Sequence, residues 1–262
     1  MTSVANSVLI PLSALLRADV PPAHWLGTTP LLDLSDDRLR VRAKALTQLS
    51  KNDRERALAI YNYVKALPFG YLPLGGQATA RQVIDAGYGS SYGKSTLFVA
   101  LLRLAGLPAR IRMVQLRGDL LRGLYDTLPT INHALVEIWL DDHWVRTDAH
   151  AFDTVYVAAA RAALGQRDWD RGYCIVRNAH NLWNGRDDAF CALSMDDSDR
   201  MPLADFGVFN DPKEFVTDYG NSPMAHAMGI LKGVQFQMVA RVLNRGIRKL
   251  RKQEFAAQAV TV

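Results

Sequence analysis

Apolar residues recur at helical spacing in two successive segments near the start of the chain. Residues 33–50 have acidic residues and a serine before the apolar positions, as at a helix N-terminus. Residues 52–67 repeat the pattern behind a cap at Asn52 or Asp53, and Pro68 ends it. The predicted inward positions are Leu39, Ala43, Leu46 and Leu49, and then Leu58, Ile60, Tyr61 and Val64. After a Gly/Pro-rich loop, residues 79–89 predict a short helix that ends in glycine.

The pattern then changes to a buried helix followed by strands. Residues 95–110 are apolar nearly all round, which indicates a helix at the centre of a domain, and Gly106 and Pro108 stop it. The Asp-Asp pair at 141–142 predicts a tight hairpin turn. The strand-like runs are residues 109–118, 133–140 and 143–148. We therefore predict an α+β fold with a helical N-terminal lobe, a central buried helix and an antiparallel sheet.

The remainder of the chain predicts irregular structure and one long helix. Residues 165–225 are rich in turn formers, and residues 225–254 are amphipathic. The apolar positions of this helix are Ile230, Leu231, Val234, Met238, Val242 and Ile247. We predict one domain of residues 1–224 and a C-terminal basic helix and tail of residues 225–262.

Charge is concentrated in that last helix. The 262 residues carry a net charge of +5, and the segment from Arg241 to Glu254 alone sums to +5. Its cations are Arg241, Arg245, Arg248, Lys249, Arg251 and Lys252. The rest of the chain is balanced, which argues against a nucleic-acid-binding face spread over the domain.

Composition excludes several other classes. The chain has no run of eighteen apolar residues, so no transmembrane helix is predicted. The first residues have no positive n-region and are interpreted as ordered chain, not as a signal peptide. Cys174 and Cys191 have no metal-binding spacing, so we expect a reducing cytoplasm and neither metal nor cofactor.

The stretch GYGSSYGKST at residues 87–96 looks like a phosphate-binding loop. Such a loop needs four residues between its first glycine and Gly-Lys-Ser, and Tyr88 stands where that first glycine should be. Nucleotide binding is therefore not predicted. The order of elements suits nucleophilic acyl chemistry instead: a nucleophile at the N-terminus of the buried helix, then His133 and Asp148 on antiparallel strands. A hairpin would bring His133 and Asp148 side by side.

At this point the sequence resembles the transglutaminase-like superfamily, a branch of the papain-like cysteine enzymes, over residues 37–157. Its carriers are GYGSSYGKSTLFVALLRLAGLPARIRMV, NHALVEIWLDDHWVRTDAH and the upstream AIYNYVKALPFGY. The resemblance implies a triad with Ser91 in the place of the family's cysteine, together with His133 and Asp148. Cys174 and Cys191 lie outside the motif and do not replace the thiol on this interpretation.

Serine in that position changes the chemistry, because a hydroxyl is far more basic than a thiol and a helix dipole hardly ionises it. Three explanations stay open: an inactivating Cys-to-Ser change, which we favour, a natural pseudoenzyme, and a natural serine enzyme. Ser91 could also be an ordinary N-cap, and Ser90 is the competing assignment. His133 could be a polar residue at a strand start, and Asp148 could simply end a strand.

Other residues receive weaker roles. Lys94 is either a solvated residue of the first helical turn or a contact to an anionic substrate group. Tyr71 and Gln77 are candidate oxyanion-hole donors, beside the backbone N–H of Ser91. Residues 169–190 either form a substrate-binding wall or cover the core.

The expected function is acyl transfer or amide or thioester hydrolysis through an acyl-enzyme. The resemblance implies enzymes ranging from cross-linkers and peptidases to small bacterial enzymes that form amides from a carrier-bound acyl group. An acidic carrier protein would suit the basic helix at Arg245, Arg248, Lys249 and Arg251. The alternatives are a catalytically inactive binding module, a cysteine-type peptidase, and an adaptor whose C-terminal helix lies on a membrane surface.

Overall fold

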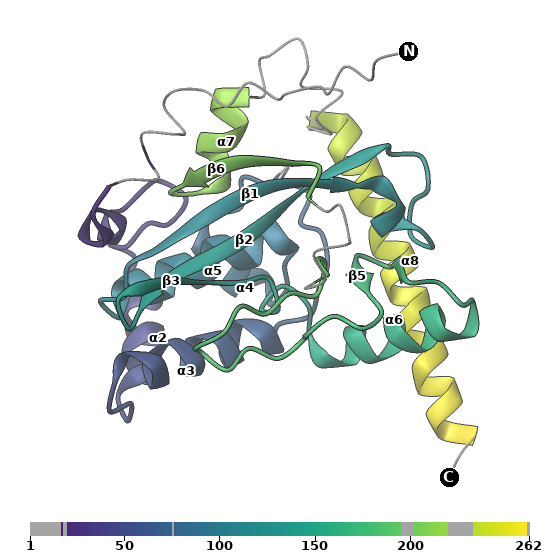
Figure 1. The fold of residues 1–262 in the computed structure, drawn as a ribbon, viewed down its shortest axis with the longest axis horizontal. Helices are drawn as coiled ribbons and strands as arrows, with labels where there is room; N and C mark the ends of the chain where they lie inside the picture. Colours follow the sequence, from purple (N-terminus) through teal and green to yellow (C-terminus); the bar gives the residue numbers. More distant parts are fainter. Residues whose placement is uncertain (1–16, 18–19, 75, 195–201, 220–232, 261–262) are drawn as a thin grey trace.

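The structure is a computed structural model that describes residue 17 and residues 20–74, 76–194, 202–219 and 233–260. It has a helical lobe, an antiparallel sheet and a long C-terminal helix (Figure 1). Among the described residues, no helix is long and apolar enough to cross a bilayer. The α+β class predicted from the sequence is confirmed.

The helical lobe begins each helix with a side-chain cap. Helix α2 (Asp37–Thr47) is capped by Asp36, and α3 (Asp53–Ala66) is capped by Asn52. Helix α4 (Ala80–Ala86) has a full capping box between Thr79 and Gln82, and it ends at Gly87 with a left-handed φ of 71°. The predicted inward face holds except at Leu49, which is 87% exposed because α2 ends before reaching it.

Helix α5 (Ser91–Leu104) lies at the centre of the molecule and is buried nearly all round, as predicted. It begins four residues earlier than the apolar run suggested, because Ser91 to Lys94 already form its first turn. The helix packs against α2, α3, α4 and the sheet strands β1 and β2. Its N-terminus therefore has a fixed position relative to the sheet.

The sheet has four antiparallel strands in the order β3-β2-β1-β6. Strands β2 (Thr130–Leu140) and β3 (His143–Thr147) form the predicted hairpin, and Asp141 and Asp142 make its turn with φ of 48° and 63°. Strand β1 is Ala109–Arg117, and β6 is Ala204–Phe209. Because β2 starts at Thr130, His133 lies within a strand, opposite Val114 of β1.

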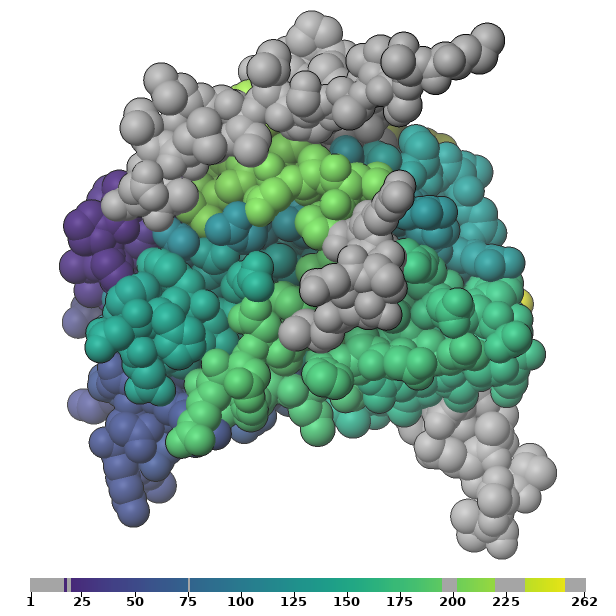
Figure 2. All heavy atoms as spheres, in the orientation of Figure 1, coloured from purple at the N-terminus to yellow at the C-terminus, as the bar shows by residue number. Residues whose placement is uncertain are grey.

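Several elements were not predicted. Helix α6 (Thr154–Gln166) follows β3, and α7 (Pro212–Tyr219) follows β6. Residues 165–225 were predicted to be irregular, but the described part contains β4 (Arg171–Gly172), β5 (Ile175–Val176), β6 and α7. Short 3-10 helices η1 (Pro22–Leu26) and η2 (Gly118–Leu121) complete the fold. The segment after α6 runs across the front of the molecule (Figure 2).

Helix α8 (Gly233–Val260) runs along one side of the molecule and packs on α6 (Figure 1). Its buried residues are Ala240, Leu243, Ile247 and Leu250. Of the apolar positions noted in the sequence, Val234, Met238 and Val242 face solvent and are 70%, 62% and 48% exposed. Steps of four residues drift around a helix, whereas the buried row alternates steps of three and four and keeps one face. Ile230 and Leu231 lie outside the described residues.

Candidate active site

His133, near the start of β2, and Asp148, directly after β3, lie in contact at the open end of the hairpin. The Nε2 atom of His133 lies 2.8 Å from Oδ2 of Asp148. His133 is 4% exposed and Asp148 is fully buried. The hairpin brings the two side chains together, as the sequence predicted. Because Nε2 is engaged, Nδ1 is the ring nitrogen left to exchange a proton with a reacting group.

Two backbone N–H groups bind the Asp148 carboxylate. Oδ1 accepts the N–H of Cys191 at 2.5 Å, and Oδ2 also accepts the N–H of Ala192 at 3.0 Å. A buried carboxylate with several donors is fixed in orientation, and so is the imidazole that it contacts. Cys191 therefore serves the site through its backbone, a role that its side chain could not reveal in the sequence.

Ser91 is the first residue of α5, and Ser90 occupies the N-cap position. The N-cap alternative for Ser91 is therefore wrong. The Ser90 side chain makes no capping hydrogen bond. The first backbone N–H of α5 to donate an intrahelical hydrogen bond is that of Lys94, to the carbonyl of Ser90. The N–H groups of Ser91, Tyr92 and Gly93 are at the positive end of the helix, where they can stabilise a developing anion.

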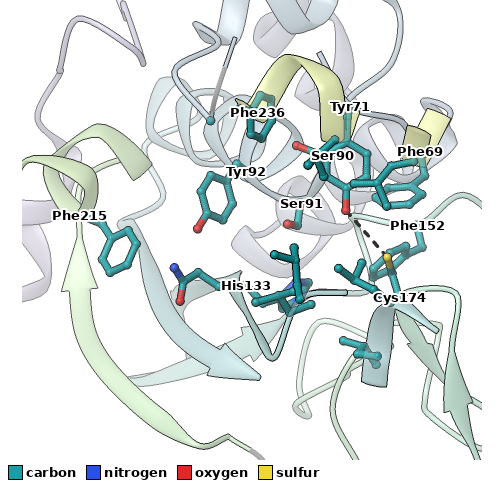
Figure 3. A pocket seen from close by; sticks show the side chains of 18 of the residues that line it. Phe69, Tyr71, Ser90, Ser91, Tyr92, His133, Phe152, Cys174, Phe215 and Phe236 are labelled. Carbon is teal, nitrogen blue, oxygen red and sulfur yellow. Dashed lines mark hydrogen bonds between the residues drawn. The ribbon is translucent and has the colours of Figure 1, made fainter. Parts of the chain in front are cut away.

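Ser91 and His133 share one cavity of about 110 Å³. Ser90, Tyr92 and Asn132 also contribute to it. In Figure 3, Ser91 lies centrally, His133 lies below it, and aromatic side chains lie on both sides. The structure thus places two of the predicted triad positions, Ser91 and His133, on a space that a substrate group could enter, and Asp148 contacts His133 without lining that space.

The long helix α8 closes part of this cavity. Phe236, Val239 and Leu243 line it, and no sequence pattern had indicated that this helix lies near the site. Asn244 fixes the contact: its Oδ1 accepts the N–H of Tyr71 and its Nδ2 donates to the carbonyl of Tyr71, both at 2.8 Å. Arg251 forms a second anchor, an ion pair with Asp153 at the start of α6.

Tyr71 and Cys174 face each other in the cavity wall. The Tyr71 hydroxyl lies 3.8 Å from Sγ of Cys174. Cys174 lies outside the sequence motif, yet it lines the same cavity as Ser91. Burial raises the pKa of this thiol to about 12, and the Tyr71 hydrogen bond only partly offsets that. Cys174 is therefore a neutral wall residue and not an activated nucleophile.

Lys94 and Gln77 do not reach the cavity. Gln77 is exposed, and Lys94 is fully buried, so the expectation of a solvated Lys94 is wrong. The Lys94 ammonium donates to the carbonyls of Leu67 at 2.7 Å and Lys65 at 3.3 Å. Burial lowers the pKa of Lys94 well below 10.5. These contacts give no support to a role in binding an anionic substrate.

A buried Ser–His pair lies one helical turn along α5 from Ser91. Ser95 Oγ is 2.9 Å from Nε2 of His150, and both residues are fully buried. His150 Nδ1 is buried without a hydrogen-bond partner among the described residues. Burial, and then the positive charge of Lys94, lower the pKa of His150 well below 6.5. This pair is neutral and closed to solvent.

Residues 169–190 mostly cover the core. Cys174 is the member of this segment in the cavity lining. Trp183 instead packs against Tyr61 and Phe98 with ring centroids 5.5 and 6.3 Å apart. Thr147 pairs with Ala189, which ties the segment to β3.

A buried His–Asp pair beside the N-terminus of a central helix, packed on an antiparallel sheet, defines a papain-like fold of the thiol-enzyme type. Residues 40–149 match the family model described as the transglutaminase-like superfamily. That segment is less than half of the chain, and it contains Ser91, His133 and Asp148 but neither α7 nor α8. The transglutaminase-like resemblance predicted from the sequence is confirmed over this core.

Two solved structures resemble part of the chain. A proposed cysteine protease from Cytophaga hutchinsonii is 20% identical, with a TM-score of 0.39, over 49% of this chain and 42% of that one. A proposed protease from Parabacteroides distasonis is 20% identical, with a TM-score of 0.34, over 48% of this chain and 26% of that one. This chain thus spans less than half the length of either protein. A comparison with curated proteins found no match.

Proposed function

We propose that the site is built for acyl transfer or hydrolysis through an acyl-enzyme, with residue 91 as the nucleophile in a cysteine form of the chain. The observation that supports this best is the contact of His133 Nε2 with Asp148, beside a cavity shared with Ser91. The contact leaves Nδ1 of His133 available as the base. Serine at position 91 is explained by an inactivating Cys-to-Ser change.

The proposed reaction has two halves. The thiol of a cysteine at position 91 gives its proton to His133 Nδ1, and the sulfur attacks an amide or thioester carbonyl carbon. N–H groups at the start of α5 stabilise the oxyanion of the tetrahedral intermediate. The imidazolium protonates the departing amine or thiol, which leaves a thioester on the enzyme. Water or an amine, deprotonated by His133, then attacks this thioester and releases the acid or the new amide.

The decisive experiment introduces the thiol. Ser91→Cys is treated with iodoacetamide across pH, and the modified residue is identified by mass spectrometry. We expect the residue 91 thiol to react with an apparent pKa well below the usual 8.5. The matched control is Ser91→Cys combined with His133→Ala, which should restore an ordinary pKa. A thiol at position 91 that reacts no faster than a free thiol contradicts the proposal.

That contrary result favours the second candidate, a catalytically inactive binding module. The observation behind it is the serine itself, since the cavity and the His133–Asp148 pair are retained without a thiol at position 91. A cysteine-type peptidase uses the same steps with a peptide bond and water. To distinguish hydrolysis from transfer, the Ser91→Cys protein is given a peptide substrate with and without an amine acceptor, and the products are compared.

We further propose that an acidic carrier protein docks on α8 and delivers the acyl group to residue 91. Arg245, Arg248 and Lys249 are exposed and form no ion pair among the described residues. Arg251 does not belong to this surface, because it binds Asp153. Arg245→Glu with Lys249→Glu should abolish binding to an acyl carrier protein at low salt. Arg40→Glu with Lys44→Glu, an exposed pair at the same spacing on α2, is the matched control. Equal binding by both variants contradicts the docking proposal.

A further inference from the structure

The described lining of the cavity contains no Asp, Glu, Lys or Arg. The buried charges nearby are directed elsewhere: Asp148 lies behind His133, and Lys94 bonds to backbone carbonyls. A charged substrate group in this cavity would lose its hydration and find no counter-charge, which is strongly unfavourable. The absence of charge among the lining residues is therefore a constraint on what can bind.

The few polar side chains of the lining gather at the reacting centre. Ser90, Ser91, Asn132 and His133 lie together in sequence pairs at the start of α5 and within β2. The remaining lining residues are mostly hydrocarbon, apart from the hydroxyls of Tyr71 and Tyr92 and the sulfur of Cys174. Aromatic members are Phe69, Tyr71, Tyr92, Phe152, Phe215 and Phe236, and aliphatic members include Leu120, Leu121, Leu128, Ile131, Val239 and Leu243. A carbonyl beside Ser91 thus has several polar partners, whereas the group attached to it meets mainly apolar side chains and no charged one.

Part of the apolar wall comes from outside the matched core. Phe215 and Val216 belong to α7, and Phe236, Val239 and Leu243 belong to α8. On α8 the cavity side is distinct from the outer side: Leu243 is 3% exposed, whereas the adjacent Val242 is 48% exposed. The protein therefore adds two helices to the catalytic core and uses their apolar faces to enclose the site.

We propose that the acyl group held beside residue 91 is uncharged and apolar, an alkyl or aryl chain, and that α7 and α8 select it. This inference rests on the proposed function and names its substrate class. The acyl part must stay in the cavity because it is bound to residue 91 in the acyl-enzyme, whereas the leaving group departs. Each methylene group buried in the cavity raises affinity by about fourfold. A short alkyl chain is therefore long enough to show whether the site prefers apolar over charged acyl groups.

The test uses alkylation of Ser91→Cys as a mimic of acylation. Rates at residue 91 are compared for N-hexyl iodoacetamide, iodoacetamide and the anionic iodoacetate, each divided by its rate with N-acetylcysteinamide. We expect the hexyl reagent to exceed iodoacetamide at least tenfold and iodoacetate to be slowest. Calorimetry of the Ser91 protein with octanamide and with octanoate gives a readout that needs no nucleophile, and octanamide should bind at least tenfold more tightly.

Variants of α8 locate the selectivity. Val239→Asp places a charge in the wall and should remove the hexyl preference. Val242→Asp, on the outer side of the same helix, should keep the preference. If Val239→Asp does not fold, Val239→Thr replaces one methyl by a hydroxyl and should lower the preference severalfold. An activated thiol without hexyl preference overturns this inference and leaves the proposed function intact. An unactivated residue 91 thiol together with tight octanamide binding overturns the proposed function and leaves the apolar preference of the cavity intact.

Discussion

The side chain of Asn244, near the middle of α8, binds both backbone polar groups of Tyr71, on the loop between α3 and α4. The two hydrogen bonds are 2.8 Å each and join residues 173 positions apart. They hold the loop that carries Phe69 and Tyr71 against the helix that carries Val239 and Leu243. Two neighbouring parts of the cavity wall are thus joined by one amide.

Replacing Asn244 should loosen this wall. Asn244→Leu leaves the N–H and carbonyl of Tyr71 without their partners, at a cost of about 1–3 kcal/mol in the free energy of unfolding. Urea denaturation measures the loss. Arg245→Leu, at the adjacent exposed position, should change the free energy by less than about 0.5 kcal/mol. Equal stabilities for the two variants would mean that the amide contributes nothing.

Asp148 should control the reactivity of residue 91 through His133. Asp148→Asn in the Ser91→Cys protein keeps the shape but favours the other imidazole tautomer and no longer stabilises the imidazolium. We expect alkylation of the residue 91 thiol at pH 7 to fall by about tenfold or more. Unfolding is measured in parallel, because the N–H groups of Cys191 and Ala192 also bind this carboxylate. Unchanged alkylation in a folded variant would exclude the orienting role.

His150 should make the protein sensitive to mild acid. Burial holds the pKa of His150 far below 6.5, so the unfolded chain binds a proton below about pH 6.5 that the native chain does not. Stability therefore falls as the pH drops below that value, by up to about 1.4 kcal/mol per pH unit. His150→Gln, whose amide can still bond to Ser95, should reduce the fall between pH 7.5 and 5.5 by about 1 kcal/mol. Parallel curves for the two proteins would contradict this assignment.

Arg251 should anchor α8 through Asp153. Burial opposes ionisation of Asp153, but the hydrogen bonds from Arg251 and from the N–H groups of Phe69 and Tyr156 outweigh it and lower its pKa below 3.8. The resulting stability is present above pH 3.8 and is lost as the pH falls through the native pKa. Arg251→Gln should cost about 1–3 kcal/mol at pH 7 and less at pH 3. Lys252→Gln, at an exposed neighbouring position, is the control, and a loss equal to that of Arg251→Gln would discount the ion pair.

The elements around the triad could be predicted because local signals and burial agree there. Asn52, Thr79 and Gly87 mark helix ends by their own chemistry, and the Asp141–Asp142 turn fixes which strands pair. The contact between His133 and Asp148 follows from that hairpin. These features need only short-range reasoning.

The remainder of the site depends on tertiary contacts that leave no local pattern. Lys94 resembles a surface lysine in the sequence, yet its stem is buried and its ammonium binds Leu67 and Lys65 carbonyls. Cys174 lies 83 positions after Ser91 and still reaches the same cavity. On α8, two apolar rows compete, and only packing against α6 decides that Leu243 rather than Val242 faces inward. No spacing rule separates such cases.

The long separation between Tyr71 and Asn244 also orders events during folding. The helices and hairpin that carry residue 91, His133 and Asp148 form from contacts much closer in sequence than the pairs of α8 with Tyr71 and Asp153. Contacts that close large loops form later, because the entropy of closure must be overcome first. A chain leaving the ribosome would therefore assemble its reacting groups before residues 233–260 arrive to enclose them, and its cavity would be completed last.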